Sequence, residues 1–379
     1  NEAYTISLVQ GLQNSGYTLE SELLKAYSSH LDDYNSKHPK KDFFTEIMNP
    51  TPSAPEFAGY SALLSKEAYN TDAALITIGR NAGEFRDRKK ENDFYLSAAE
   101  TSLIKEVAAV YHAKGKKVIV IINTGGVIDI ASWRNEVDAI LLTWQGGQEA
   151  GNAVADILSG KVNPSGKLAT TIPVKYEDEY SSKNFPGVEF PEKATTGMLG
   201  MKAIPAEVRY EEGIYVGYRY FNTFNVKPAY PFGYGLSYTN FSYSNLKLSS
   251  TRLNGKITAS ITIQNTGKTA GKEVVQVYLT APGKTMDKPA IELKAFAKTR
   301  LLAPGEKQTL QFVLTAADLA SFDPARSAWV AEPGEYLVKA GASSLNILQT
   351  AKFTLSKEII TEKCNKVMLP EVPVKELTH

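Results

Sequence analysis

The sequence has little of what several common kinds of site require. It contains one cysteine, Cys364, which excludes an internal disulfide framework but leaves the cellular compartment open, because many secreted and periplasmic proteins have no disulfides. The four histidines show no metal-ligand spacing, so no metal site is expected from them. The glycine pairs at 125–126 and 146–147 do not complete a dinucleotide fingerprint, so no cofactor is expected.

Charge and hydropathy exclude two further classes of partner. The net charge is +1 without a basic cluster, which argues against nucleic acid. No apolar run approaches the ~20 residues that span a bilayer, so no membrane segment is expected. No signal peptide is visible, and Asn1 is not an initiator methionine. We therefore expect that the beginning of the protein has been removed or lies on another segment.

The remaining composition is that of a globular protein. Hydrophobic residues make up 43% and charged residues 22% of the chain, which suffices for a sizeable buried core. A length of 379 residues predicts two or three domains.

The first part of the chain alternates between strand and helix patterns. Residues 73–78 (AALITI) predict a buried strand, and 117–122 (KVIVII) and 139–144 (AILLTW) are runs typical of strands buried on both faces of a parallel sheet. Residues 97–100 (SAAE) have the form of a capping box, followed by an apolar helical face ending at Tyr111. This order predicts a doubly wound, mostly parallel α/β sandwich.

The last part of the chain follows a period of two. Apolar residues alternate over 257–263, 275–279, 310–314 and 336–340, with turn signals between the runs. This pattern predicts a β-sandwich of the fibronectin type III or immunoglobulin kind.

Between these parts, residues 175–238 are rich in tyrosine, glycine and proline without clear periodicity, which indicates a long connecting stretch. The predicted organisation is an α/β sandwich over 1–205, a connector over 206–240, a fibronectin type III-like domain over 241–357 and a C-terminal tail over 358–379.

A lone carboxylate stands on a glycine-punctuated loop after the first predicted strand. Residues 79–88 read GRNAGEFRDR, and 92–97 (NDFYLS) open the helix that follows. Open α/β sheets place their chemistry at the carboxyl ends of strands, which makes Glu84 the candidate catalytic side chain. By itself, a glutamate in a polar loop is more often a solvated carboxylate, so the surrounding motif decides.

That motif resembles the acid/base loop of glycoside hydrolase family 3, the family of many β-glucosidases and β-xylosidases. Four further strings resemble the family in the expected order: 144–151 (WQGGQEAG), 163–168 (NPSGKL), 212–221 (EGIYVGYRYF) and 231–238 (PFGYGLSY). The resemblance covers nearly the whole chain. It implies a (β/α)8 barrel, an α/β sandwich and a fibronectin-like domain, of which this chain supplies the last two.

The resemblance also implies roles for single residues. Retaining glycosidases use a nucleophile and an acid/base about 5–5.5 Å apart; in the family the nucleophile is an aspartate on the barrel, for which this chain offers no candidate. Glu84 is then the general acid/base. Asp87 and Arg88 are expected to brace the loop through charge-assisted hydrogen bonds. Phe85 stands where the family often has glycine, and it either stacks on a sugar ring or covers core.

The implied function is part of an exo-acting retaining β-glycosidase, foremost a β-glucosidase that removes terminal non-reducing β-D-glucosyl residues. Its expected partners are a β-linked oligosaccharide or glucoside and the barrel domain, with self-association left open. Two alternatives stay open: a non-catalytic carbohydrate-binding or scaffolding module, and a family 3 β-xylosidase. We expect a periplasmic or secreted location, and we expect this chain alone to be inactive.

Overall fold

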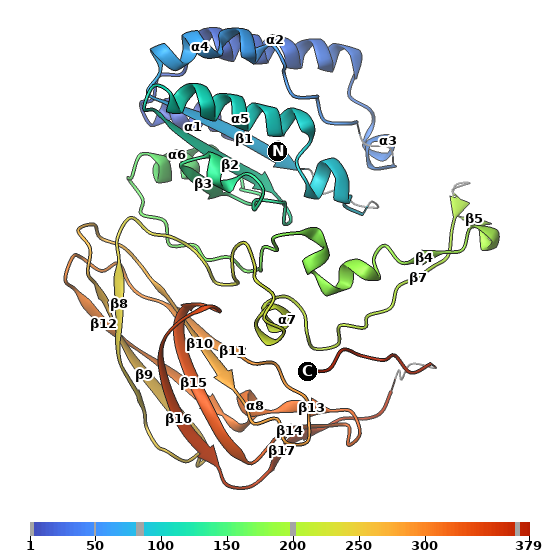
Figure 1. Ribbon diagram of the computed structural model, residues 1–379, viewed down its shortest axis with the longest axis vertical. Helices are drawn as coiled ribbons and strands as arrows, with labels where there is room; N and C mark the ends of the chain where they lie inside the picture. The colour runs from blue at the N-terminus through green and yellow to red at the C-terminus, as the bar shows by residue number, and fades with distance from the viewer. Residues whose placement is uncertain (1–3, 49–50, 81–86, 198–201, 368–371) are drawn as a thin grey trace. The chain divides into compact units, whose positions relative to one another are not determined.

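The computed structural model describes residues 4–48, 51–80, 87–197, 202–367 and 372–379. The chain divides into two compact units, Asn1–Val162 and Asn163–His379, and each is described by itself (Figure 1). No helix in these residues is both long and apolar enough to cross a lipid bilayer. The domain boundaries expected from the sequence stay predictions.

The first unit is built on a parallel sheet. Strands β1 (Ala73–Arg80), β2 (Lys117–Thr124) and β3 (Ala139–Leu142) lie in the order β1-β2-β3, with parallel pairing throughout. The carboxyl ends of all three strands therefore lie at one edge of the sheet. This arrangement confirms the predicted α/β class.

Helices are layered against this sheet (Figure 1). Helix α5 (Ala98–His112) packs on β1 and β2, α4 (Tyr60–Asn70) packs on α5, and α2 (Ser21–Lys37) packs on α4. The capping box of Ser97 and Glu100 that begins α5 is present as predicted. The buried face of α5 is also the predicted one: Leu103, Ile104, Val107, Ala108 and Tyr111.

A second helical pair depends on two glycines. Helix α1 (Leu8–Asn14) packs against α6 (Ala150–Leu158). A β-carbon on Gly11 would lie 2.1 Å from the carbonyl carbon of Gly151, so any larger residue would force the helices apart. The described residues of this unit also contain the short helix α3 (Phe43–Met48).

The two faces of β1 differ in exposure. Ala74, Ile76 and Ile78 are buried, whereas Leu75 on the other face is 37% exposed. The sequence predicted a buried strand, and this is wrong for one of the two faces. The burial of β1 alternates from residue to residue. The sequence does not show this alternation, because Leu75 on the exposed face is apolar and makes the run resemble a strand buried on both faces.

The second unit contains the β-sandwich. A four-stranded sheet, β11-β10-β15-β16, faces a three-stranded sheet, β12-β9-β8, and the pairs are antiparallel. The strands are β8 (Phe241–Leu248), β9 (Lys256–Asn265), β10 (Val274–Thr280), β11 (Glu292–Lys298), β12 (Lys307–Thr315), β15 (Gly334–Ser343) and β16 (Asn346–Leu355).

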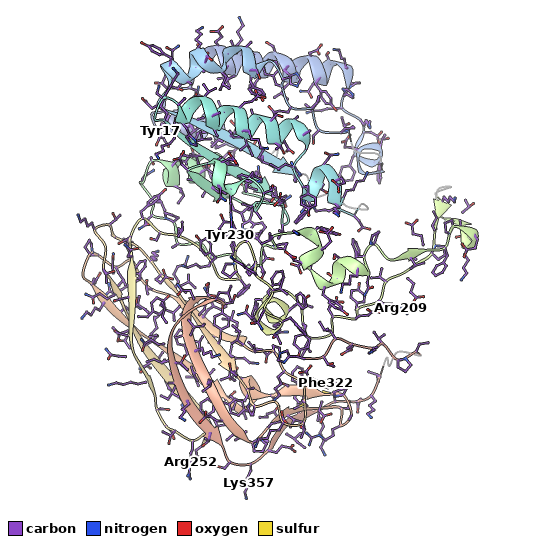
Figure 2. The ribbon with its side chains drawn as sticks, in the orientation of Figure 1. Tyr17, Arg209, Tyr230, Arg252, Phe322 and Lys357 are labelled. Atoms are coloured by element: carbon purple, nitrogen blue, oxygen red, sulfur yellow. The ribbon has the colours of Figure 1, made fainter. Side chains whose placement is uncertain are left out.

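A smaller sheet follows the order β13-β14-β17. Its strands are β13 (Ser321–Asp323), β14 (Ala328–Ala331) and β17 (Ile359–Lys363), with the short helix α8 (Ala316–Leu319) before β13. Phe322, labelled in Figure 2, lies with its ring centroid 5.6 Å from that of Trp329 on the adjacent strand. The pairing of β17 with β14 places the first residues after 358 in a sheet.

The predicted alternation fills the sandwich core. Phe312 on β12 is 5% exposed, and Ile261 on β9 and Val338 on β15 are fully buried. The core joins these three strands to β10, β8 and β16. The predicted fibronectin-like part is therefore confirmed as an antiparallel β fold.

Strand β10 departs from the alternation because residues of the connecting stretch cover its outer face. The Gln276 side chain donates to the Gly233 carbonyl at 3.0 Å, and the rings of Tyr218 and Tyr278 lie 5.9 Å apart. Gly233 has φ +82°, and a β-carbon there would lie 1.9 Å from the Gln276 carboxamide oxygen. Only glycine fits this approach.

The stretch between the sheets has little regular structure of its own. It contains α7 (Tyr218–Thr223) and two short strand pairs, β4 (Val188–Glu189) with β7 (Ala206–Glu207) and β5 (Thr195–Thr196) with β6 (Lys202–Ala203). Asn163 fixes one end, since its Oδ1 accepts from the Tyr238 amide at 2.8 Å and its Nδ2 donates to the Ala270 carbonyl at 3.0 Å.

Candidate active site

The candidate site lies at the carboxyl edge of the β1-β2-β3 sheet. Glu84 and Phe85, on the loop after β1, lie outside the described residues, and their predicted roles stay predictions. Asp87 and Arg88 are described. The residues immediately before and after the loop show how its two ends are held.

The end of β1 is held by Arg80. Its Nη1 and Nη2 donate to the two carboxylate oxygens of Glu100 at 2.6 and 2.9 Å, and its Nε donates to the Asp93 carbonyl at 2.9 Å. The side chains of Arg80 and Glu100 are only 12% and 15% exposed. Such a bidentate, partly buried pair is among the stronger polar contacts in proteins. Glu100 thus closes the N-terminus of α5 and fixes the last residue before the loop.

The other end is held by Arg88. Its Nε donates to Asp93 Oδ1 at 2.9 Å, and its Nη1 donates to the Val127 carbonyl at 2.7 Å. A β-carbon on Gly126 would lie 2.7 Å from Nη1, so glycine is needed for this approach. Arg88 therefore ties the residues after the loop both to the segment before α5 and to the turn after β2.

Asp87 differs from its neighbour. It is exposed, and it has no ion pair with another residue of the described ranges. The sequence grouped Asp87 and Arg88 as bracing residues; among the described contacts, the bracing comes from Arg88.

The two carboxylates behind the loop are held as anions. Burial would raise the pKa of Asp93, but hydrogen bonds from Arg88 and the Lys89 amide lower it below its usual value. Burial would likewise raise the pKa of Glu100, and hydrogen bonds from Arg80 and Ser97 lower it. A general acid must be protonated before it reacts. Asp93 and Glu100 are therefore anchors for the loop and are unsuited to that role.

Two left-handed residues shape the surrounding turns. Asn92, between Arg88 and Phe94, has φ +58°, and Trp144, two residues after the end of β3, has φ +53°. Asparagine adopts this conformation readily, whereas for tryptophan it is an outlier that the surroundings must hold in place. Trp144 follows β3 at the sheet edge where β1 ends at Arg80.

Sequence reasoning missed the role of Arg80 and the second role of Glu100. Arg80 belongs to the loop motif at 79–88, and Glu100 belongs to the capping box at 97–100. A signal existed in their combination, because an arginine that ends a parallel strand can reach the first turn of the helix that follows it.

The family assignment comes from comparison with known proteins. The profile described as "Glycosyl hydrolase family 3 C-terminal domain" matches residues 1–238. The chain belongs to this family. The profile of the "Fibronectin type III-like domain" matches residues 273–344. The predicted family and fold class are both confirmed.

Relatives of known structure and name support the assignment. The chain is 45% identical to β-glucosidase 3B from Thermotoga neapolitana, solved with α-D-glucose, with a TM-score of 0.84 over 94% of this chain and 47% of that one. It is 33% identical to a β-glucosidase of Ruminococcus albus over 100% of this chain and 38% of the relative. It is also 33% identical to an exo-α-(1→6)-L-arabinopyranosidase of Bifidobacterium breve, over 86% and 40% respectively.

The coverage of the relatives is partial. This chain spans 38% of the length of the Ruminococcus albus enzyme and 40% of that of β-glucosidase A from Butyrivibrio fibrisolvens. The remaining part of each relative has no counterpart in the 379 residues.

Proposed function

We propose that this chain supplies the acid/base loop and the C-terminal domains of a retaining β-glucosidase, with Glu84 as the general acid/base. The observation that carries the proposal is the family motif around Glu84, set on a loop whose two ends are fixed by Arg80 and Arg88. The named relatives that are β-glucosidases support the choice of reaction.

In the proposed reaction an aspartate of the barrel domain attacks the anomeric carbon of the terminal sugar. The glycosidic C–O bond breaks, and Glu84 gives its proton to the departing oxygen. A glycosyl ester to the aspartate remains. Glu84, now a carboxylate, takes a proton from water while the water oxygen attacks the anomeric carbon, which releases the sugar with retained configuration and restores both carboxyl groups.

Anchoring of the loop fits this double role. The acid must lie within hydrogen-bond reach of the leaving oxygen and about 5–5.5 Å from the nucleophile. A loop of this length with two free ends would spread its glutamate over many positions. Arg80 and Arg88 limit where the chain enters and leaves the loop, which reduces the entropy lost when Glu84 is positioned.

The proposed partner is the barrel domain that carries the nucleophile. The partial coverage of the relatives supports this, and so does the exposed Leu75 face of β1, since sheets of this class are usually covered on both sides. The proposed substrate is a terminal β-D-glucoside, and the proposed location is periplasmic or extracellular.

A second sugar specificity has one observation in its favour. The Bifidobacterium breve relative is named for an arabinopyranoside, so chains of this kind also serve enzymes that act on pentopyranosides. A β-xyloside is therefore the second candidate substrate.

The test is complementation. The purified 379-residue chain should not hydrolyse aryl β-glucosides, and adding a separately produced barrel segment should restore turnover. A chain carrying Glu84→Gln, mixed with the same barrel, should hydrolyse cellobiose-like substrates ~10²–10⁴-fold more slowly than the wild-type mixture. Turnover by the unmixed chain at a rate typical of glycosidases would contradict the proposal. Aryl β-xylosides run in parallel decide between the two sugars.

A further inference from the structure

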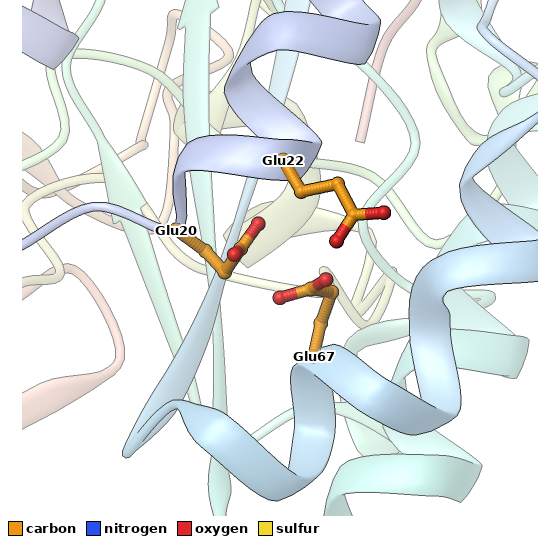
Figure 3. A group of neighbouring side chains, drawn as sticks. All are labelled: Glu20, Glu22 and Glu67. Atoms are coloured by element: carbon orange, nitrogen blue, oxygen red, sulfur yellow. The ribbon is translucent and has the colours of Figure 1, made fainter.

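Three glutamates of the first unit converge at the junction of α2 and α4. Glu20 is the N-cap of α2, Glu22 lies in its first turn, and Glu67 comes from α4. Figure 3 shows the three carboxylates pointing toward one another from these two helices. One carboxylate oxygen of each residue lies within 4.8 Å of the others.

Glu67 differs from the other two glutamates because it is buried, whereas acidic clusters are common only at the surface. It is 2% exposed, and among the described residues neither of its oxygens has a hydrogen-bond donor when the carboxylates are ionised. Burial and the adjacent Glu20 carboxylate raise the pKa of Glu67. Buried polar groups without a partner are rare because their desolvation is not compensated. The Glu67 carboxylate is aimed at Glu20 and Glu22, which can supply no proton when they are ionised.

The donors near the cluster are already used by other groups. Glu20 Oε2 accepts from the Leu23 amide at 2.7 Å as the helix cap, and Lys66 pairs with Glu22. Thr71 donates its hydroxyl proton to the Glu67 backbone carbonyl at 2.7 Å. The Tyr111 hydroxyl of α5 lies 2.8 Å from the Thr71 hydroxyl, and because the Thr71 proton is already donated, Tyr111 is the donor of this pair.

The charges that face one another leave a deficit. The cluster carries three carboxylates from the N-terminus of α2 and from α4, and Lys66 supplies one positive charge. Tyr111, the titratable residue facing Glu67 from α5, is neutral at pH 7, since an ordinary phenol titrates near pH 10 and burial raises the pKa of Tyr111 further. When all three carboxylates are ionised, two negative charges stay uncompensated.

We propose that Glu20, Glu22 and Glu67 bind a divalent cation, Ca²⁺ in preference to Mg²⁺, that joins α2 to α4. The ligands are hard oxygens, and two oxygens on opposite sides of a calcium ion lie up to about 5 Å apart, since each bond is about 2.3–2.6 Å long. Protein carboxylates fill part of the coordination sphere and water fills the rest. The exposed side of the cluster at Glu22 gives the ion its entry.

The site is structural and does not depend on the proposed glycosidase reaction. The ion compensates the buried Glu67 and ties the outermost helical layer to the helix beneath it. Its loss should loosen α2 while the sheet that carries the Glu84 loop remains folded.

The first experiment measures thermal unfolding of the full 379-residue chain after removal of metals with a chelator. Adding Ca²⁺ to about ten times its dissociation constant should raise the unfolding midpoint by about 3–6 °C. Glu67→Gln keeps the shape of the side chain but removes its charge, and this variant should show no rise. Asp33→Asn is the matched control, because Asp33 lies on the same α2 helix but pairs with Lys37 at the surface; it should respond like the wild type.

A second variant sharpens the result. Lys66→Met removes the ammonium group that competes for Glu22, so Ca²⁺ should act at a concentration roughly tenfold lower than in the wild type. Tb³⁺ bound at the same place should luminesce when tyrosine is excited, and Ca²⁺ should displace it in the wild type and in Lys66→Met.

Three outcomes would overturn the proposal. The first is that neither Ca²⁺, Mg²⁺ nor Mn²⁺ moves the wild-type midpoint up to about 10 mM, well above the range of weak extracellular calcium modules. The second is an equal rise in Glu67→Gln, which would mean that the ion binds elsewhere. The third is a midpoint that rises on acidification and ignores cations, which would mean that Glu20 and Glu67 share a proton.

Discussion

The two sheets that matter most in this chain, the parallel sheet of the first unit and the β-sandwich of the second, are completed to different degrees. In the sandwich, β10 is buried on both faces, because Gln276 and Tyr278 on its outer side are covered by the connecting stretch. In the parallel sheet, β1 is buried on one face, and Leu75 on the other is 37% exposed.

The difference in burial corresponds to a difference in role between the two sheets. The sandwich contains its own core, and the connecting stretch of the same unit covers the outer face of β10. The parallel sheet carries the candidate catalytic loop at one edge and leaves part of a face open. In the proposed enzyme, that incomplete surface belongs to the part of the chain that works with another domain.

The largest expected effect tests whether the sandwich is closed. Phe312→Ala should lower the free energy of unfolding by about 3–5 kcal/mol, because Phe312 is 5% exposed within the core. Phe296→Ala is the matched control on β11, where the ring is 70% exposed, and it should change the free energy by no more than about 0.5 kcal/mol. Urea unfolding measures both. Equal losses would mean that the two rings share one environment.

A smaller effect tests the anchor of the catalytic loop. Arg80→Met should lower the free energy of unfolding by about 1.5–3 kcal/mol, because it leaves the partly buried Glu100 carboxylate without its two guanidinium donors. Lys161→Met removes an exposed pair with Asp156 and should cost less than about 1 kcal/mol. If both substitutions cost the same, Arg80 is no stronger an anchor than a surface lysine.

The pH dependence of this cost has a definite sign. The pKa of Glu100 is lowered in the folded chain, so the stabilisation is present above the unfolded value of about 4.3 and is lost as the pH falls through the folded value. The difference in the free energy of unfolding between the wild type and Arg80→Met should therefore become smaller as the pH is lowered from 7 to about 3. A difference that stays constant over this range would contradict the assignment of the shift to Arg80.

The smallest expected effect concerns the open face of β1. In the 379-residue chain, Leu75→Ala should lower the free energy of unfolding by less than about 1 kcal/mol, because much of the side chain is already exposed to water. In the full-length enzyme the same change should cost about 2–3 kcal/mol if another segment covers this face. An equally small cost in both proteins would show that the face stays open to solvent.

Much of the fold could be predicted from the sequence because its signals are local. The capping box at Ser97 lies within four residues, and the alternation around Phe312 needs only a single strand. The parallel order of β1, β2 and β3 follows from strands separated by helices. Each of these predictions depends on neighbours in the sequence.

What could not be predicted depends on contacts between distant residues. The outer face of β10 is buried because Gly233, more than forty positions before Gln276 in the sequence, packs on it. The convergence of Glu20 and Glu67 also requires α2 and α4 to be placed in space. For the candidate site, the motif around Glu84 indicated the loop, but the clamp of Arg80 on Glu100 needed the structure.

The central claim is that Glu84 is the acid/base, and Glu84→Ala in the reassembled enzyme tests it most directly. The variant should lose ~10²–10⁴-fold on cellobiose-like substrates, which need a proton on the leaving oxygen, and far less on glucosides of acidic phenols. The glycosyl-enzyme should then accumulate, and azide should speed its turnover and appear in the product as a β-glycosyl azide. Equal losses on good and poor leaving groups, with no effect of azide and no azide in the product, would contradict the assignment of Glu84.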